Sequence, residues 1–392
     1  MIMNNNVYIN RFSAFFPNEP VGNDEMEQYI GLVNEKSLLA KRLILGKNGI
    51  TNRYYALNRE GEATHTNVQM AAHAVRGLTD ERLTLEQIDL IACGTATPEQ
   101  LMPSHGVMVH GELKANRHTE VVSFAGSCCA GIHALKYAYF STLTGDASNA
   151  VCVASERFSA WMTARYFEKE SELINQLKKR PILAFEKEFL RWMLSDGSVA
   201  VLLQNQPAED ALSYRIEWIE LTSYANELET CMYAGADKNE KGELAGWASY
   251  PEAEWLNRSL FSLKQDTKLL DENIIKLGGR FLQDIIAKRN FDPESVDWYL
   301  PHLSSMYFEQ KIEQEFAFYN YEMPKSKWFI NLPKIGNVAS VSPFAMLEEL
   351  NRSGRVKKGD RILIMVPESA RFSYAYILLT CTDGAHPVST EN

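Results

Sequence analysis

The chain has 392 residues, of which 45% are hydrophobic, so it is long enough for one large core or two fused domains. A net charge of −10 argues against a general nucleic-acid binder, and no stretch has the ~18–20 apolar residues of a membrane span. Six cysteines occur without zinc spacing, and residues 1–10 lack a signal-peptide pattern. We expect a reduced, cytoplasmic protein with no metal site, no cofactor, and no nucleic-acid or membrane partner.

The first half of the chain predicts a strand, a turn, a helix and a second strand. Residues 88–94 have the pattern of a short buried strand, entered through Asp89. Forty residues after Asp89 comes Cys129, which opens a segment with apolar residues at helical spacing. A further strand begins at Ala150 and ends at Glu156. Residues 161–192 lack strand alternation and are rich in Glu, Lys, Leu and Phe, which predicts a mostly helical insertion.

The second half repeats this order at an offset of about 208 residues. Asp297 enters a strand that ends at His302, and Asn337 follows Asp297 by forty residues, as Cys129 follows Asp89. An apolar helical pattern and another strand come next, at residues 344–350 and 361–366. The repeat predicts a duplicated α/β protein with related halves at residues 1–205 and 206–392. Because ligands of α/β sheets bind where strands end, Cys129, His302 and Asn337 are expected to converge.

Cys129 is the candidate nucleophile. A thiol at the start of a helix sees the positive end of the helix dipole, which lowers its pKa and favours the thiolate. The repeat aligns Cys129, and not its neighbour Cys128, with Asn337. Two other interpretations stay open on the residues alone: Cys128 as the nucleophile, and Cys129 as a buried structural cysteine.

Several segments together resemble the β-ketoacyl carrier-protein synthase III branch of the thiolase superfamily. They are Gly49 to Arg53, Ser-Cys-Cys-Ala-Gly at residues 127–131, Leu194 to Leu202, the strand with its histidine at residues 296–302, and Ile-Gly-Asn-Val-Ala-Ser at residues 335–340. The resemblance extends over roughly residues 49–375. It implies the thiolase fold, a duplicated five-layered αβαβα arrangement with two pseudo-equivalent halves. It also implies a homodimer that takes acyl groups from an acyl carrier protein, coenzyme A, or both.

The resemblance further implies a role for each residue of the site. Cys129 would carry the acyl group, and its backbone N–H would stabilise the oxyanion on the acyl-enzyme. His302 and Asn337 would donate hydrogen bonds to the thioester carbonyl of the second substrate.

Two departures point to a smaller group within the superfamily. The usual glycine-rich turn before the last strand reads Glu-Ser-Ala-Arg at residues 368–371, and Tyr307 stands where an arginine often linked to carrier docking is found. These features resemble the ketosynthase/cyclases of bacterial dialkylresorcinol, cyclohexanedione and isopropylstilbene pathways. That group joins two β-ketoacyl units and closes a six-membered ring.

Glu156 is the candidate acid or base for ring closure. It ends a buried strand near the expected pocket, where burial raises the pKa of a carboxyl group. The alternative is a salt bridge to Arg157 or to Arg371, which we place at the matching position of the second half.

Two other functions compete with a ketosynthase/cyclase. One is a chain-initiating synthase that condenses acyl-CoA with malonyl carrier protein, and it would use the same Cys129, His302 and Asn337. The other is a non-catalytic partner subunit of a ketosynthase. Such subunits usually lack the nucleophile or the histidine, and this chain retains both.

Overall fold

The computed structural model describes residues 6–32, 35–115, 117–164, 190–239 and 241–383. Nine strands form one sheet, in which hydrogen-bonded neighbours follow the order β13, β14, β15, β8, β1, β7, β6, β4, β5. Their bounds, in chain order, are β1 Tyr8–Phe15, β4 Leu90–Thr95, β5 Glu120–Ala125, β6 Ala150–Glu156, β7 Gly197–Gln204, β8 Ser213–Ser223, β13 Trp298–Pro301, β14 Arg361–Glu368 and β15 Ser373–Thr382.

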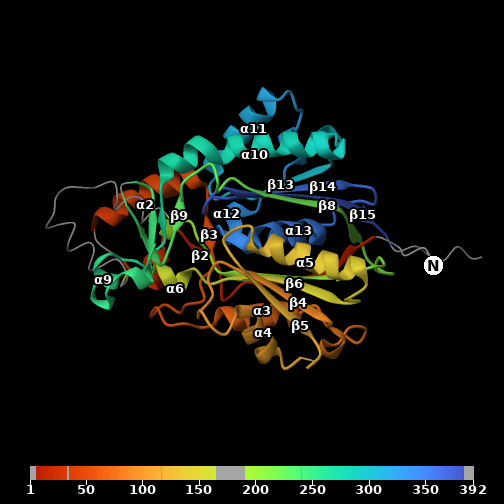
Figure 1. The fold of residues 1–392 in the computed structure, drawn as a ribbon, viewed down its shortest axis with the longest axis horizontal. Coiled ribbons are helices and arrows are strands. Elements are labelled where there is room, and N and C mark those ends of the chain that lie inside the picture. The colour runs from red at the N-terminus through yellow and green to blue at the C-terminus, as the bar shows by residue number, and fades with distance from the viewer. Residues whose placement is uncertain (1–5, 33–34, 116, 165–189, 240, 384–392) are drawn as a thin grey trace, which may run out of the picture.

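The sheet folds over a pair of central helices, α5 (Ala130–Thr144) and α13 (Ser342–Arg352). Figure 1 shows five layers: α10 (Thr267–Arg289) and α11 (Glu309–Phe318), one part of the sheet, the two central helices, the other part of the sheet, and α3 (Asn67–Arg76) with α4 (His105–Leu113). Strands β4 and β6 are buried along their whole length, as expected for strands covered on both faces. The fold class predicted from the sequence, a duplicated thiolase fold, is confirmed.

The two parts of the sheet have matching strand directions. Strand β4 runs parallel to β6 and β6 antiparallel to β7, and in the second part β13 runs parallel to β14 and β14 antiparallel to β15. The β4–β5 pair has a reduced counterpart, a single parallel bridge between Tyr299 and Trp328. A two-residue ladder between β1 and β8 joins the parts into one sheet. The division into domains at residue 205 stays a prediction.

The two aspartates that mark the repeat make equivalent contacts. The Asp89 carboxylate accepts hydrogen bonds from the backbone N–H groups of Ser148 and Asn149, each at 2.9 Å, just before β6. The Asp297 carboxylate accepts one from the N–H of Arg361 at 2.8 Å, at the start of β14. In both parts the aspartate therefore fixes the start of the neighbouring parallel strand.

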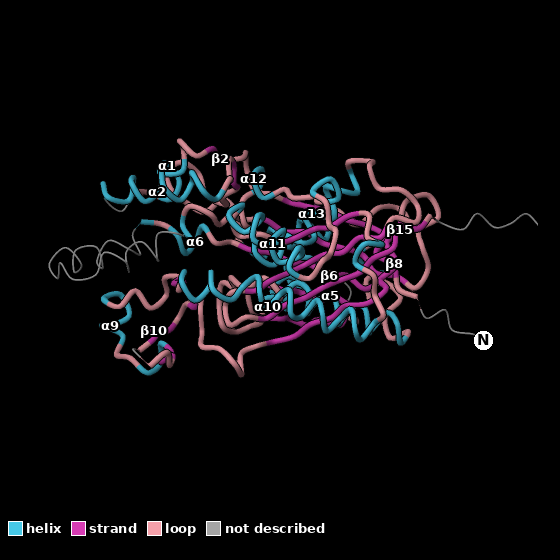
Figure 2. The backbone as a smooth tube through the Cα atoms, turned by 90° about the horizontal axis from the view of Figure 1, so that it is seen from above, coloured by secondary structure: helices cyan, strands magenta, loops and turns pink. Residues whose placement is uncertain are grey.

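The shorter elements gather mainly at one end of the molecule. Figure 2 shows α1, α2, α6, α9 and β10 at the end opposite the N-terminus. The remaining elements are α1 Met26–Ile30, α2 Glu35–Asn48, α6 Ser159–Met162, α9 Glu252–Asn257, α12 Leu332–Ile335, β2 Val21–Gly22, β3 Asn52–Arg53, β9 Met232–Tyr233, β10 Ala236–Lys238, β11 Leu244–Gly246 and β12 Lys264–Gln265, with short 3₁₀ turns at Leu85–Gln87, Trp247–Ser249, Pro293–Ser295, Met306–Phe308, Lys325–Lys327 and Ala339–Val341. Most of the helical insertion predicted at residues 161–192 lies outside the described residues.

The contact between the central helices depends on a glycine. A Cβ added at Gly131 of α5 would lie 2.7 Å from the carbonyl oxygen of Ser340 and 2.8 Å from the ring of Phe344. We predict that Gly131→Ala destabilises the protein by about 1–3 kcal/mol, the usual cost of overpacking a core, measured as a lower midpoint of urea unfolding. Gly111→Ala is the control, because a Cβ there in helix α4 meets nothing within 4 Å. An unchanged midpoint for Gly131→Ala contradicts the described packing.

Candidate active site

The turn that carries the two cysteines lies between β5 and α5 and is held by β14. Cys129 is the N-cap residue of α5, as the sequence predicts, and its side chain is fully buried. The Cys129 thiol donates a hydrogen bond to the carbonyl oxygen of Val366 at 3.5 Å. The nucleophile candidate of the first half is thus fixed by a strand of the second half.

A carboxylate that sequence reasoning missed also holds this turn. Glu368, the last residue of β14, accepts hydrogen bonds through Oε2 from the backbone N–H of Ser127 at 3.1 Å and of Cys129 at 2.9 Å. The Cys129 N–H, expected to serve the acyl-enzyme oxyanion, is therefore engaged by Glu368 in this structure. The only sequence signal was the departure at residues 368–371 from the usual glycine-rich turn.

The direction expected for the pKa of Cys129 is wrong for this structure. Burial, the largest cause, and the nearby Glu368 carboxylate raise the pKa of the Cys129 thiol well above its ordinary value. The helix dipole alone would lower it. Removal of the thiolate from water next to a like charge outweighs the dipole.

His302 follows β13 directly, and its backbone N–H donates to the carbonyl oxygen of Met365 at 2.8 Å. Its side chain is buried, and Nδ1 has no hydrogen-bond partner within the described part of the chain. Burial lowers the pKa of His302 to about 4, so the ring is neutral at pH 7. A neutral imidazole has one donor and one acceptor nitrogen to offer a substrate.

Asn337 is positioned by its backbone. Its N–H donates to the carbonyl of Met193 and its carbonyl accepts from the N–H of Ser195, both at 2.9 Å. The preceding Gly336 has φ 73°, and a Cβ there would lie 2.9 Å from that of Ser195. The side-chain Oδ1 accepts from the N–H of Ala339 at 3.0 Å, which directs the amide nitrogen to other acceptors.

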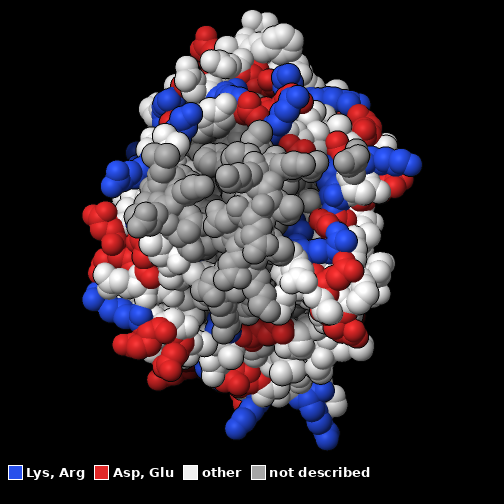
Figure 3. Space-filling model, turned by 90° about the vertical axis from the view of Figure 1, so that its left-hand side faces the viewer, with Lys and Arg blue, Asp and Glu red and all other residues white. Residues whose placement is uncertain are grey.

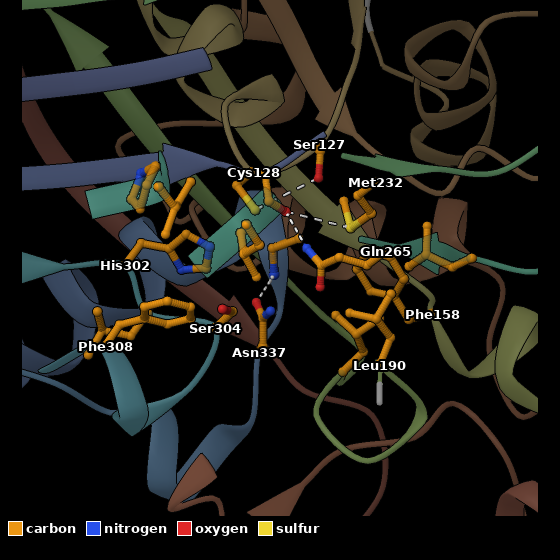
Figure 4. A pocket seen from close by; sticks show the side chains of 18 of the residues that line it. Ser127, Cys128, Phe158, Leu190, Met232, Gln265, His302, Ser304, Phe308 and Asn337 are labelled. Atoms are coloured by element: carbon orange, nitrogen blue, oxygen red, sulfur yellow. Dashed lines mark hydrogen bonds between the residues drawn. The ribbon is translucent and has the colours of Figure 1, made fainter. Parts of the chain in front are cut away.

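One cavity brings the candidate residues together. Figure 4 shows the side chains of Cys128, His302 and Asn337 around it. Its walls are mostly apolar, and its empty space is about 580 Å³ including the mouth. The lining residues include Phe158, Leu190, Leu194, Met232, Leu263, Gln265, Leu270, Ile274, Leu303, Phe308, Ala339, Pro367 and Ser369. Cys129 does not line the cavity, whereas its neighbour Cys128 does.

Glu156 does not face this cavity, contrary to expectation. It is fully buried at the end of β6, where both carboxylate oxygens accept hydrogen bonds. The donors are the hydroxyls of Ser340, Thr97 and Thr95 and the backbone N–H of Ala96. Burial raises the pKa of Glu156 to about 7, although these hydrogen bonds oppose the shift.

The expected salt-bridge partners of Glu156 are engaged elsewhere. Arg157 pairs with Glu99 at 2.8 Å, and Arg371 donates to the carbonyl oxygen of Leu228. The residue at the matching strand end of the second half is Glu368 and not Arg371, because β6 ends at Glu156 and β14 ends at Glu368. Strand β14 has eight residues and β6 has seven.

Among the described residues, no group of His, Cys, Asp and Glu side chains has the arrangement of a metal site. Within the same residues, no helix has both the length and the apolar character needed to cross a membrane.

Comparison with known proteins supports the fold. Residues 286–377 match the family model described as 3-oxoacyl-[acyl-carrier-protein (ACP)] synthase III C terminal. The structure of AbyA1, a tetronic acid condensing enzyme, superposes with a TM-score of 0.73 at 18% identity and covers 95% of this chain and 99% of its own. OleA from Xanthomonas campestris gives a TM-score of 0.71 at 20% identity, covering 96% and 98%. The chain has the thiolase fold.

Curated proteins named β-ketoacyl-[acyl-carrier-protein] synthase III are similar to this chain over nearly its whole length. A β-ketoacyl-[acyl-carrier-protein] synthase III from Clostridium perfringens is 22% identical over 361 residues, which cover 92% of this chain and 95% of that protein. One from Aquifex aeolicus is 23% identical over 353 residues, covering 90% and 92%. This thiolase-fold protein is thus similar over nearly its whole length to synthase III condensing enzymes.

The buried imidazole of His302 predicts a pH-dependent stability. Because its folded pKa of about 4 lies below the ordinary value of 6.5, the unfolded state binds more protons between these pH values, and stability falls as pH falls. We predict that between pH 7 and pH 5 the unfolding free energy of wild type falls by about 2 kcal/mol more than that of His302→Gln, measured by urea unfolding. His118→Gln, at an exposed histidine, is the control and should behave as wild type. Equal losses in His302→Gln and wild type would show that the ring is not buried as described.

Proposed function

We propose that the chain forms carbon–carbon bonds through an acyl-enzyme on Cys129, joins two β-ketoacyl thioesters and closes the product into a cyclohexanedione- or resorcinol-type ring. The observation that carries the condensation is His302, which has a buried imidazole nitrogen without a partner among the described residues and which lines one apolar cavity with Asn337 and the cysteine turn. A buried polar group without a partner is costly, so such a nitrogen is typical of a site that a ligand completes.

The first step is a thioester exchange. Cys129 Sγ attacks the carbonyl carbon of the incoming thioester, the bond to the carrier sulfur breaks, and the carrier leaves as a free thiol that takes up the proton. Before this attack, the Cys129 thiol must give up its hydrogen bond to the Val366 carbonyl. The apolar walls of the cavity suit a fatty acyl chain.

The second step uses His302 and Asn337. A β-ketoacyl thioester is acidic at the carbon between its two carbonyl groups, and loss of that proton to water gives an enolate. Hydrogen bonds from the His302 ring and the Asn337 amide stabilise the negative charge on the thioester oxygen. The carbanion attacks the Cys129 acyl carbonyl, a carbon–carbon bond forms, and the Cys129 thiolate is released. The Cys129 thiolate released at the end of this step takes up a proton from water in return.

Ring closure needs a further proton transfer, for which we propose Glu156. Support comes from its pKa of about 7, which lets it gain and lose a proton near neutrality. Since Glu156 bonds to the Ser340 hydroxyl and Ser340 follows the cavity-lining Ala339, the proton would pass through Ser340. AbyA1, a tetronic acid condensing enzyme, adds support, because it has the same fold and a tetronic acid is itself a ring compound.

The alternative is a chain-initiating synthase that condenses acyl-CoA with malonyl carrier protein. The names of the curated relatives favour it. The two functions share the acyl-enzyme and differ in the second substrate and in ring formation.

The proposed partners are an acyl carrier protein, coenzyme A thioesters and a second copy of the chain. On the face that Figure 3 shows, acidic and basic side chains are interspersed around the described surface, so no docking patch is assigned there. The homodimer and the cytoplasmic location stay predictions.

The nucleophile is tested by intact-mass measurement after incubation with an acyl thioester. We predict that Cys129→Ala abolishes the acyl adduct, because its thiol is the acceptor. Cys128→Ala is the matched control, since it removes the adjacent, cavity-lining thiol and should still form the adduct. The reverse pattern, with an adduct on Cys129→Ala and none on Cys128→Ala, assigns the nucleophile to Cys128.

The role of Glu156 is tested by product analysis of Glu156→Gln. This variant retains the shape and one accepting oxygen but no longer titrates. We predict normal self-acylation and release of linear or shunt products, with ring formation slowed by about 10²–10⁴-fold, the usual contribution of general acid–base catalysis. Cyclic product at the wild-type rate, or a variant that does not fold, would show that Glu156 is structural.

A further inference from the structure

Glu368 combines burial with an incomplete set of partners. It is 8% exposed, and among the described residues no Lys or Arg forms an ion pair with it. Its Oε2 takes both N–H groups, from Ser127 and Cys129, while Oε1 has no hydrogen bond to any described residue. Its chain neighbours Pro367 and Ser369 both line the cavity. The strand end that carries Glu368 thus borders the cavity, and the carboxylate is attached by one oxygen.

The repeat supplies an internal comparison. Glu156 and Glu368 end matching strands, and each reaches into the other half of the chain: Glu156 to Ser340, and Glu368 to Ser127 and Cys129. Glu156 accepts hydrogen bonds on both oxygens from hydroxyl and backbone donors. Only Glu368 has a carboxylate oxygen without a hydrogen bond to a described residue, and its two chain neighbours line the cavity. Of the two, Glu368 is therefore the one that can be displaced.

The N–H groups that Glu368 binds are those the reaction needs. They lie at the start of α5, a helix of 15 residues, where backbone donors and the helix dipole favour a negative charge. In the proposed reaction the carbonyl oxygen of the group on Cys129 becomes negative and requires the Cys129 N–H. The Glu368 carboxylate has the charge and the hydrogen-bonding capacity of that oxyanion and stands in its place.

We propose that Glu368 is a positioning residue that closes the oxyanion site at the start of α5 in the free enzyme and is displaced when an acyl thioester binds to Cys129. This inference rests on the proposed function, because it assigns the N–H pair to the acyl group. While Glu368 is in place, its charge adds to burial in keeping the Cys129 thiol protonated and protects it from non-specific alkylation. The raised pKa of Cys129, to which Glu368 contributes, supports this consequence.

The test measures how fast iodoacetamide alkylates Cys129 as a function of pH, with tandem mass spectrometry to distinguish Cys129 from Cys128. In Glu368→Gln and Glu368→Ala the negative charge is gone, so the thiolate forms more easily. We expect the midpoint of the pH profile to fall by about one unit, which is about tenfold faster alkylation at pH values below both midpoints. Replacing a side chain that carries no charge in the free enzyme would not shift this midpoint downward.

Glu315→Gln is the matched control. Burial raises the pKa of Glu315 as it does that of Glu368, but Glu315 lies on α11 and does not line the cavity. Its profile should coincide with that of wild type. An unchanged or higher midpoint in folded Glu368→Gln and Glu368→Ala overturns the inference. Failure of both variants to fold overturns it too, because the carboxylate is then a requirement of the turn and not a displaceable occupant.

Acylation by an acyl-CoA, followed by intact mass on the same samples, separates this inference from the proposed function. One outcome is a lower alkylation midpoint in the Glu368 variants together with no acyl adduct in wild type. In that case the condensing function fails, while the electrostatic control of Cys129 by Glu368 stands. An adduct on Cys129 in every variant, with identical midpoints, means that the function stands and the Glu368 inference fails.

Discussion

The site depends on the contact between the Cys129 turn of the first half and strand β14 of the second. The Val366 carbonyl accepts from the thiol, and the Glu368 carboxylate accepts from the Cys129 N–H. Both contacts exist because the sheet folds back on itself and buries α5 against the second half, where Gly131 lets the chain pass close to Ser340. The same close approach leaves room for one cavity at the strand ends, between His302 and the cysteine turn.

Burial in this contact explains the electrostatics of the site. Away from water, the charged forms of Cys129 and His302 are both disfavoured, so the thiol is protonated and the imidazole is neutral at pH 7. A neutral imidazole suits a hydrogen-bonding role at a thioester oxygen. The resting state is therefore poised for substrate binding, and not for spontaneous reaction of the thiol.

Much of this arrangement is predictable from the sequence, because the repeat is visible there. Asp89 and Asp297 recur at the same distance from Cys129 and Asn337, and the structure shows why: each aspartate fixes the start of a parallel strand. The positions of His302 and Asn337 at the cavity follow from strand ends meeting at one edge of a sheet. The hydrophobic pattern of the strands and helices is enough to predict these positions.

The direction of individual side chains was not predictable in the same way. Glu156 and Glu368 both end buried strands, and only three-dimensional packing directs Glu156 to Ser340 and Glu368 to Cys129. The pKa of Cys129 was expected to fall because the helix dipole can be inferred from the local sequence, whereas burial raises it and the Glu368 carboxylate, 239 positions away, adds to the rise. A local sequence motif does not indicate how deeply the folded chain buries a residue.

In the proposed reaction, the enzyme joins two β-ketoacyl thioesters in one cavity. The most direct measurement gives the purified enzyme two β-ketoacyl carrier thioesters that differ in chain length and in ¹³C labelling, and identifies the products by mass. The proposed reaction gives a product that contains carbon from both substrates and has lost water on forming a ring. Products that arise only when malonyl carrier protein is supplied, extended by two carbons and never cyclic, would contradict it and assign the chain to initiation of chain synthesis.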